Sequence, residues 1–251
     1  MDAFLTLKDG RRLSYRRVSG DKPLEIVFMH GTLSDKNASK SLFLQEYCQK
    51  KGFSFTAFDF IGHGQSSGKY TDGTIGLWLD NALDVIDRAT RSPLILVGSS
   101  MGGWISLLAA RARPERVKAV VGLAAAADFT VGVWASFSEE QKKDVLEKGV
   151  VHTPNGWTEE GDPWTRDLFE DGKNHLVLNG ADSLDVACPM TLIHGGKDDC
   201  VPVETAFKIC DAAKSENVKV VVLKNSGHRL SEPPELAVLE NELNILTGSA
   251  L

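Results

Sequence analysis

A serine stands at the centre of a short glycine-rich run that could hold it as a nucleophile. Residues 94–98 form a run of apolar and small side chains, and Ser100 follows it within the pattern Gly-x-Ser-x-Gly. A serine on a sharp turn from strand to helix has a strained backbone and needs small neighbours, which Gly98, Gly102 and Gly103 supply. The run therefore predicts a nucleophilic Ser100 at the N-terminus of a helix.

A histidine and an aspartate lie where they could activate this serine. A serine hydroxyl needs a base to accept its proton, and the base needs a carboxylate to orient it. Asp198 and His228 each follow a predicted strand, and the ends of parallel strands meet at one edge of a sheet. We predict that Ser100 is the nucleophile, His228 the base and Asp198 the orienting acid, in the chain order Ser, Asp, His.

Two other aspartates are alternatives for the acid. Asp199 is adjacent to Asp198, and Asp128 follows the preceding strand, from which it could also reach His228. We favour Asp198 because of its spacing to the Val201-Pro202 pair and its position at the strand end. Asp199 is then expected to cap the next helix or to face solvent.

The oxyanion of an acyl-transfer reaction needs two N–H donors. The backbone amide of Met101, directly after the nucleophile, should be one of them. The other is expected from the loop after residues 25–29, where Gly31 lets the chain turn tightly. We favour the amide of Thr32 there, with Leu33 as second choice.

The remaining five histidines are expected to have no direct part in the chemistry. His30 and His63 are predicted to make structural hydrogen bonds near the site, and His194 to satisfy backbone groups at a strand end. His152 and His175 are expected at the surface.

The elements that must position these residues alternate along the chain. Strands separated by single helices indicate a parallel sheet with helices on both faces. We therefore predict an α/β fold with a mostly parallel eight-stranded sheet, in which the first two strands form a hairpin around Asp9-Gly10. The predicted strands are 4–7, 12–17, 25–29, 53–58, 94–97, 117–123, 190–193 and 218–223. The predicted helices are 41–50, 77–88, 104–112, 203–214 and 235–246.

A long segment, about residues 129–186, interrupts this alternation and is called the insert below. It is too long for a simple connection between strands. From Asp128 to Asp185 the chain has thirteen acidic and five basic residues, a net charge of −8. We expect residues 1–251 to form one domain whose insert is a small cap over the site. Its aromatic side chains should pack the cap or line an acyl site, and they are Trp134, Phe137, Trp157, Trp164 and Phe169.

Composition excludes several classes of protein. The chain has 251 residues, 42% hydrophobic content and a net charge of −6, which argues against nucleic acid as a partner. No apolar run approaches the roughly 18 residues of a membrane span. The N-terminus has no basic segment typical of a signal peptide, and the four cysteines show no metal-ligand spacing. We expect buried, reduced thiols, no metal or cofactor, and a cytoplasmic protein.

Several motifs together resemble the α/β-hydrolase superfamily over nearly the whole chain. They are His30-Gly31, Asp59-x-x-Gly62-His63-Gly64-x-Ser66, Gly98–Gly102, Asp198-x-x-Val201-Pro202 and Gly227-His228. Residues 95–104, 194–202 and 226–229 resemble the mitochondrial palmitoyl-protein thioesterase branch, also described as mycophenolic acid acyl-glucuronide esterase. The resemblance implies hydrolysis of acyl esters or thioesters, with a small molecule or an acylated protein as substrate. The chain departs from the branch in lacking a recognisable transit peptide.

Other functions are compatible with some of these residues. A carbon–carbon bond hydrolase would use the same three residues, and a binding module could use the insert surface without catalysis. A haloalkane dehalogenase is disfavoured because it needs a carboxylate in place of Ser100. The acidic insert disfavours highly anionic substrates such as coenzyme A thioesters, if its charge faces the site.

Overall fold

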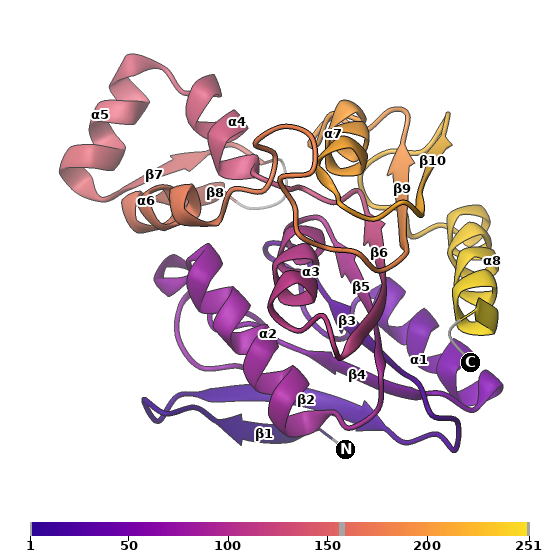
Figure 1. The fold of residues 1–251 in the computed structure, drawn as a ribbon. Helices are drawn as coiled ribbons and strands as arrows, with labels where there is room; N and C mark the ends of the chain where they lie inside the picture. The colour runs from indigo at the N-terminus through magenta and orange to yellow at the C-terminus, as the bar shows by residue number, and fades with distance from the viewer. Residues whose placement is uncertain (1, 156–158, 250–251) are drawn as a thin grey trace.

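An eight-stranded sheet forms the centre of the computed structural model (Figure 1), which describes residues 2–155 and 159–249. The strand order is β1-β2-β4-β3-β5-β6-β9-β10. The pairs β1–β2 and β2–β4 are antiparallel, and the other five pairs are parallel. The predicted hairpin and mostly parallel sheet are confirmed. The strands are β1 Ala3–Thr6, β2 Arg12–Val18, β3 Glu25–Met29, β4 Ser54–Phe58, β5 Leu94–Ser99, β6 Val117–Leu123, β9 Met190–Gly195 and β10 Val218–Leu223.

Helices cover both faces of this sheet, as predicted. Side chains of α1 and α8 pack in one buried cluster with one face of the sheet, and α2, α3 and α7 pack in a second cluster with the other. Both faces are apolar, which is why β3, β4 and β5 are buried along their whole length. The helices are α1 Ser39–Lys51, α2 Ile75–Ala89, α3 Met101–Ala112, α7 Glu204–Ala212 and α8 Pro233–Ser249, with a short 3-10 helix, η1, at Tyr70–Asp72.

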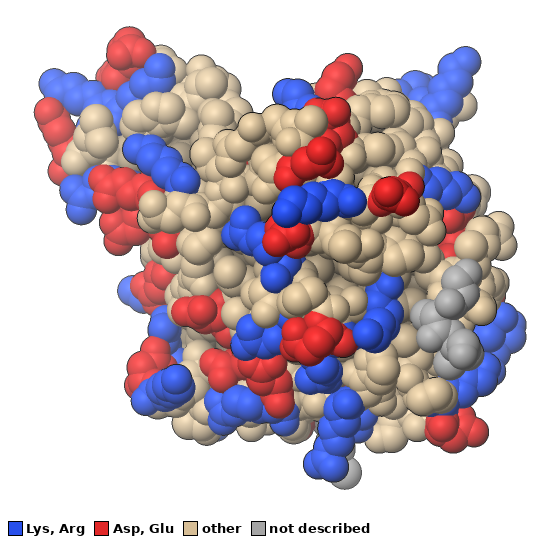
Figure 2. Space-filling view, viewed as in Figure 1, with Lys and Arg blue, Asp and Glu red and all other residues tan. Residues whose placement is uncertain are grey.

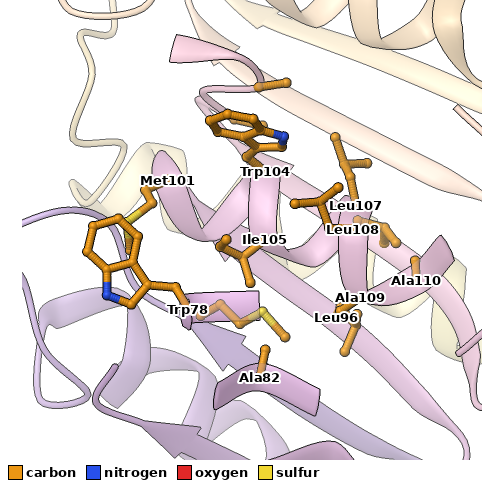
Figure 3. Close-up of a cluster of buried hydrophobic side chains, with 14 of the residues drawn as sticks. Trp78, Ala82, Leu96, Met101, Trp104, Ile105, Leu107, Leu108, Ala109 and Ala110 are labelled. Atoms are coloured by element: carbon orange, nitrogen blue, oxygen red, sulfur yellow. The ribbon is translucent and has the colours of Figure 1, made fainter. Parts of the chain in front are cut away.

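Helix α3 begins three residues earlier than the apolar pattern predicts. Its first turn contains Gly102 and Gly103, which carry no side chain and so leave no periodicity to read. Further along, α3 is buried on nearly all sides. In Figure 3, Met101 and Ile105 of α3 lie beside Trp78 of α2. The helix behind the predicted nucleophile is thus fixed by packing.

The insert leaves the sheet after β6 and returns at β9. It has its own two-stranded sheet and a small buried cluster of Phe137, Val145 and Phe169. Trp134 packs on that cluster, and Trp157 lies outside the described residues. The elements of the insert are α4 Phe129–Ser136, α5 Glu139–Lys148, β7 Val150–Thr153, β8 Asp162–Thr165, α6 Arg166–Gly172 and η2 Lys173–His175.

Charges of both signs lie over the insert in Figure 2, where it occupies the upper left. Each lysine of α5 has an acidic partner on the same helix, in the pairs Lys142–Glu139, Lys143–Glu147 and Lys148–Asp144. These exposed pairs neutralise part of the acidic charge locally, although the segment remains acidic overall.

Candidate active site

The backbone at Ser100 has the strained conformation that the glycine-rich run predicts. Ser100 has φ 53° and ψ −120°, outside the regions that side-chain-bearing residues favour. Its neighbours leave no room for larger residues: a Cβ on Gly102 would lie 2.2 Å from the Met29 carbonyl oxygen, and one on Gly98 would lie 2.2 Å from the Gly102 oxygen. The tight turn therefore requires glycine on both sides of the serine.

Of the three residues predicted to act together, His228 lies within hydrogen-bonding distance of both Ser100 and Asp198. His228 Nε2 is 3.1 Å from Ser100 Oγ, and His228 Nδ1 is 2.9 Å from Asp198 Oδ2. Ser100 follows β5, Asp198 follows β9 and His228 follows β10, at the carboxyl edge of the sheet. The arrangement can pass a proton from the serine hydroxyl to the imidazole while the carboxylate holds the ring.

The carboxylate of Asp198 is held on both oxygens. Its Oδ1 accepts hydrogen bonds from the backbone amides of Cys200, at 3.0 Å, and Val201, at 2.8 Å. Burial alone would raise the pKa of Asp198. The hydrogen bonds from His194, His228 and Val201 outweigh burial and hold the pKa well below its ordinary value. Asp198 therefore stays ionised beside His228 throughout the neutral range.

His194 has a contact that the sequence prediction missed. Its Nε2 lies 2.9 Å from the Val201 carbonyl oxygen, as the prediction of a backbone partner requires, and also 3.2 Å from Asp198 Oδ2. Burial opposes a charge on His194, yet the bonds to Asp198 and Val201 leave its pKa raised. The signal in the sequence for this contact is a histidine four residues before the acid.

The two alternative aspartates have other partners. Asp199 is exposed, and the next helix, α7, begins after Val203, so Asp199 faces solvent without capping that helix. The carboxylate of Asp128 accepts hydrogen bonds from the amides of Val177 and Leu178, at 3.0 and 2.9 Å. Asp128 thereby ties the start of the insert to its end.

The loop after β3 lies against the nucleophile. A Cβ on Gly31 would be 3.1 Å from Ser100 Cβ, so only glycine allows this approach. Thr32, the predicted oxyanion donor, is half-buried beside it, and Leu33, the second choice, has φ 53° and an exposed side chain. The same loop is anchored by the buried Lys36, whose Nζ lies 2.8 Å from Asp59 Oδ2. No pattern in the sequence marks Lys36 as a buried residue.

A lysine also supports the loop that carries His228. Lys40, near the start of α1, donates from Nζ to the carbonyl oxygen of Arg229, the residue after His228. Burial lowers the pKa of Lys40 to about 8. This contact joins segments 189 residues apart, and the sequence prediction did not include it.

His30 and His63 have structural contacts near the site, in agreement with their predicted roles. His30 donates from Nδ1 to the Gly31 carbonyl oxygen at 2.7 Å, and its Nε2 accepts from the Phe60 amide. Burial lowers the pKa of His30 to about 4 and that of His63 to about 3. Both rings are therefore neutral near pH 7.

The two histidines of the insert differ in exposure. His152 on β7 is exposed, as predicted. His175 is half-buried, because its carbonyl oxygen accepts from Trp104 Nε1 at 3.2 Å and its ring lies 3.4 Å from Asp171. The surface prediction for His175 was wrong, since this residue joins the insert to α3.

Comparisons with known proteins identify the family of the chain. Residues 26–160 match the family described as alpha/beta hydrolase fold. The chain is 38% identical over 238 residues to the palmitoyl-protein thioesterase ABHD10, mitochondrial, of Homo sapiens, covering 94% of this chain and 77% of that protein. The Bos taurus protein of the same name is 37% identical over 238 residues, which again cover 94% of this chain and 77% of that protein.

Solved structures of two similar proteins superpose on nearly the whole chain. The alpha/beta hydrolase domain-containing protein 10 from mouse superposes with a TM-score of 0.92 at 33% identity, covering 100% of both chains. A putative hydrolase from Agrobacterium vitis S4 superposes with a TM-score of 0.93 at 28% identity, covering 98% of both chains.

The chain belongs to the α/β-hydrolase family. Within it, the chain falls in the branch of the ABHD10 proteins, as its motifs predict. It is a serine hydrolase of ester or thioester bonds, as the sequence indicates.

The comparisons also correct one prediction. The expected cytoplasmic location is wrong, because the similar ABHD10 proteins are named as mitochondrial. Reduced thiols and a negative net charge are compatible with more than one compartment, so composition could not decide the location. Among the helices of the described residues, none is long and apolar enough to cross a membrane.

Proposed function

We propose that this hydrolase cleaves long-chain acyl thioesters, including those on protein cysteines, through an acyl-enzyme at Ser100. The names of its relatives, palmitoyl-protein thioesterases, support the substrate class. The observation that carries the mechanism is the continuous contact from Ser100 through His228 to Asp198, with separations of 3.1 and 2.9 Å. The small-molecule ester that the sequence also allows would react by the same steps.

In the first step, Ser100 Oγ attacks the acyl carbonyl carbon while His228 Nε2 takes the hydroxyl proton. Asp198 stays ionised and stabilises the imidazolium that forms. The negative charge on the carbonyl oxygen is stabilised by the amides of Met101 and Thr32, an assignment supported by the close approach of Gly31 to Ser100. His228 then gives its proton to the departing thiolate, and the acyl group remains on Ser100.

In the second step, His228 removes a proton from water, which attacks the acyl-serine. Collapse of this second tetrahedral intermediate returns the proton to Ser100 and releases the carboxylic acid. The depressed pKa of Asp198 suits both steps, because the carboxylate remains available to hold the ring.

We further propose that residues 129–186 form a cap that selects the acyl chain. A row of aromatic rings runs from α3 into the insert: the ring centroids of Trp104 and Phe129 are 5.5 Å apart, and those of Phe129 and Trp164 are 6.1 Å apart. Trp104 is fully buried one helical turn after Ser100, and the partly exposed rings of Phe129 and Trp164 continue the row into the insert, where they offer apolar surface. An aliphatic chain is the acyl group that such surface would hold.

The decisive experiment compares turnover and labelling of matched variants. The wild-type protein should react with a fluorophosphonate probe and cleave a palmitoyl thioester with a higher kcat/KM than a short-chain thioester or an oxygen ester. Ser100→Ala should lose both reactions, while Ser99→Ala, altered at the buried preceding residue, should keep its labelling. Labelling of Ser100→Ala would overturn the mechanism, and a preference for short chains would overturn the substrate class.

A further inference from the structure

An exposed cysteine lies beside the residues proposed to act in catalysis. Cys200 was expected to be buried, like the other cysteines, but its side chain is exposed on the loop after β9. One donor atom each from Asp198, Cys200 and His228 lies within 4.8 Å of the other two. A buried carboxylate, a partly exposed imidazole and an exposed thiol therefore lie close together.

These donors have the chemistry of a zinc site. Zn²⁺ binds cysteine sulfur, histidine nitrogen and carboxylate oxygen at bond lengths of about 2.0–2.3 Å, usually in a tetrahedron. The ligand atoms of such a tetrahedron are roughly 3.5 Å apart, and the three donors here lie within 4.8 Å of one another before any ion is bound. Mg²⁺ and Ca²⁺ prefer sets made only of oxygen ligands.

The surroundings of Cys200 also favour a cation. Its Sγ lies 3.5 Å from Asp199 Oδ1, which adds a second carboxylate next to the three donors. The carboxylates of Asp198 and Asp199 would stabilise a bound Zn²⁺ together with the Cys200 thiolate.

We propose that Asp198, Cys200 and His228 form a Zn²⁺ site whose occupation inhibits the hydrolase. His228 Nδ1, the nitrogen facing Asp198, would bind the ion and leave its present partner. Zn²⁺ binds a neutral imidazole, so the ring proton moves from Nδ1 to Nε2, and only the thiol proton of Cys200 is released for each ion. Because Nε2 then carries a proton and Nδ1 holds the ion, the His228 ring can no longer accept the proton of Ser100. The inhibition rests on the proposed function, whereas the binding of metal does not.

The test measures inhibition and binding separately. Ester hydrolysis is followed while buffered free Zn²⁺ is raised through the micromolar range, and each variant is normalised to its own rate without metal. For Cys200→Ala we expect the inhibitory concentration to rise about tenfold or more, because one ligand is lost. Cys188→Ala, which removes a half-buried thiol elsewhere, should match the wild type. Mg²⁺ should inhibit none of the three proteins.

Competition with a chromogenic chelator then gives the stoichiometry without using activity. We expect one Zn²⁺ per chain for the wild type and Cys188→Ala, and loss of that ion in Cys200→Ala. Equal inhibition of wild type and Cys200→Ala, or no Zn²⁺ bound by the wild type, would overturn the proposal. If the protein fails to hydrolyse any ester, the proposed function is wrong, and the binding measurement still decides whether the metal site exists.

Discussion

His194 Nε2 lies 3.2 Å from Asp198 Oδ2, the same oxygen that holds the ring of His228 at 2.9 Å. The acid is thus shared by two histidines, of which only His228 reaches the nucleophile. His194 cannot touch a substrate through this contact, but it can fix the direction of the carboxylate. We regard it as a positioning residue.

Removing this contact should lower kcat with little change in KM. His194→Phe deletes the donor to Asp198, and the loss of one hydrogen bond to a charged group should cost about tenfold in kcat. His194→Gln keeps an N–H near the position of Nε2 and should retain more of the rate. The exposed His152→Gln is the control. If KM rises while kcat stays at the wild-type value, the positioning role is wrong.

Asp198 and Asp199 form a matched pair of neighbours with different contacts. Asp198→Asn should reduce kcat roughly 10⁴-fold, because an amide cannot stabilise the imidazolium of His228. Asp199→Asn should stay near the wild-type rate, since that side chain is exposed. Steady-state kinetics on a chromogenic ester checks both. A large loss in Asp199→Asn with an active Asp198→Asn would reverse the assignment.

Substitution of Gly102, near Ser100, should differ sharply in its effect from substitution of Gly132 in the insert. Gly102→Ala would bring a Cβ to 2.2 Å from the Met29 carbonyl oxygen, and we expect it to destabilise the fold by about 3 kcal/mol. Gly132→Ala on α4 meets nothing within 4 Å and should stabilise the helix by about 0.5–1 kcal/mol. Urea denaturation of the two variants measures the difference. Equal stabilities would contradict the packing described for the turn.

The buried neutral His63 should make stability depend on pH. Burial lowers its pKa to about 3, so the unfolded chain binds more protons than the folded chain between pH 6.5 and that value. Stability should therefore fall as pH falls through this range, with about 2 kcal/mol of the loss at pH 5 due to His63.

His63→Phe removes this proton binding and should lose correspondingly less stability on acidification. The free energy of unfolding at neutral pH and at pH 5 gives the comparison, with His152→Gln as a control that keeps the wild-type dependence. Identical losses in wild type and His63→Phe would contradict the assignment.

The sequence by itself determined the elements of the main sheet and of the helices beside it, and the order of the predicted catalytic residues. Strand and helix periodicity, and the small residues around Ser100, are local signals because they reflect the needs of the backbone within a few residues. Six of the eight predicted strands agree with the structure to within a residue at each end, and β5 and β9 run two residues further. Strand ends then indicated that Ser100, Asp198 and His228 would meet, since parallel strands share one edge.

Only the tertiary structure decided contacts made by side chains far apart in the chain. The buried pair of Lys36 and Asp59, the bond from Lys40 to the Arg229 carbonyl and the half-buried state of His175 all depend on how loops pack. A charged residue is usually exposed, so nothing local marks the exception. Cys200 is the converse case, because its exposure beside Asp198 and His228 follows from the path of one loop in three dimensions.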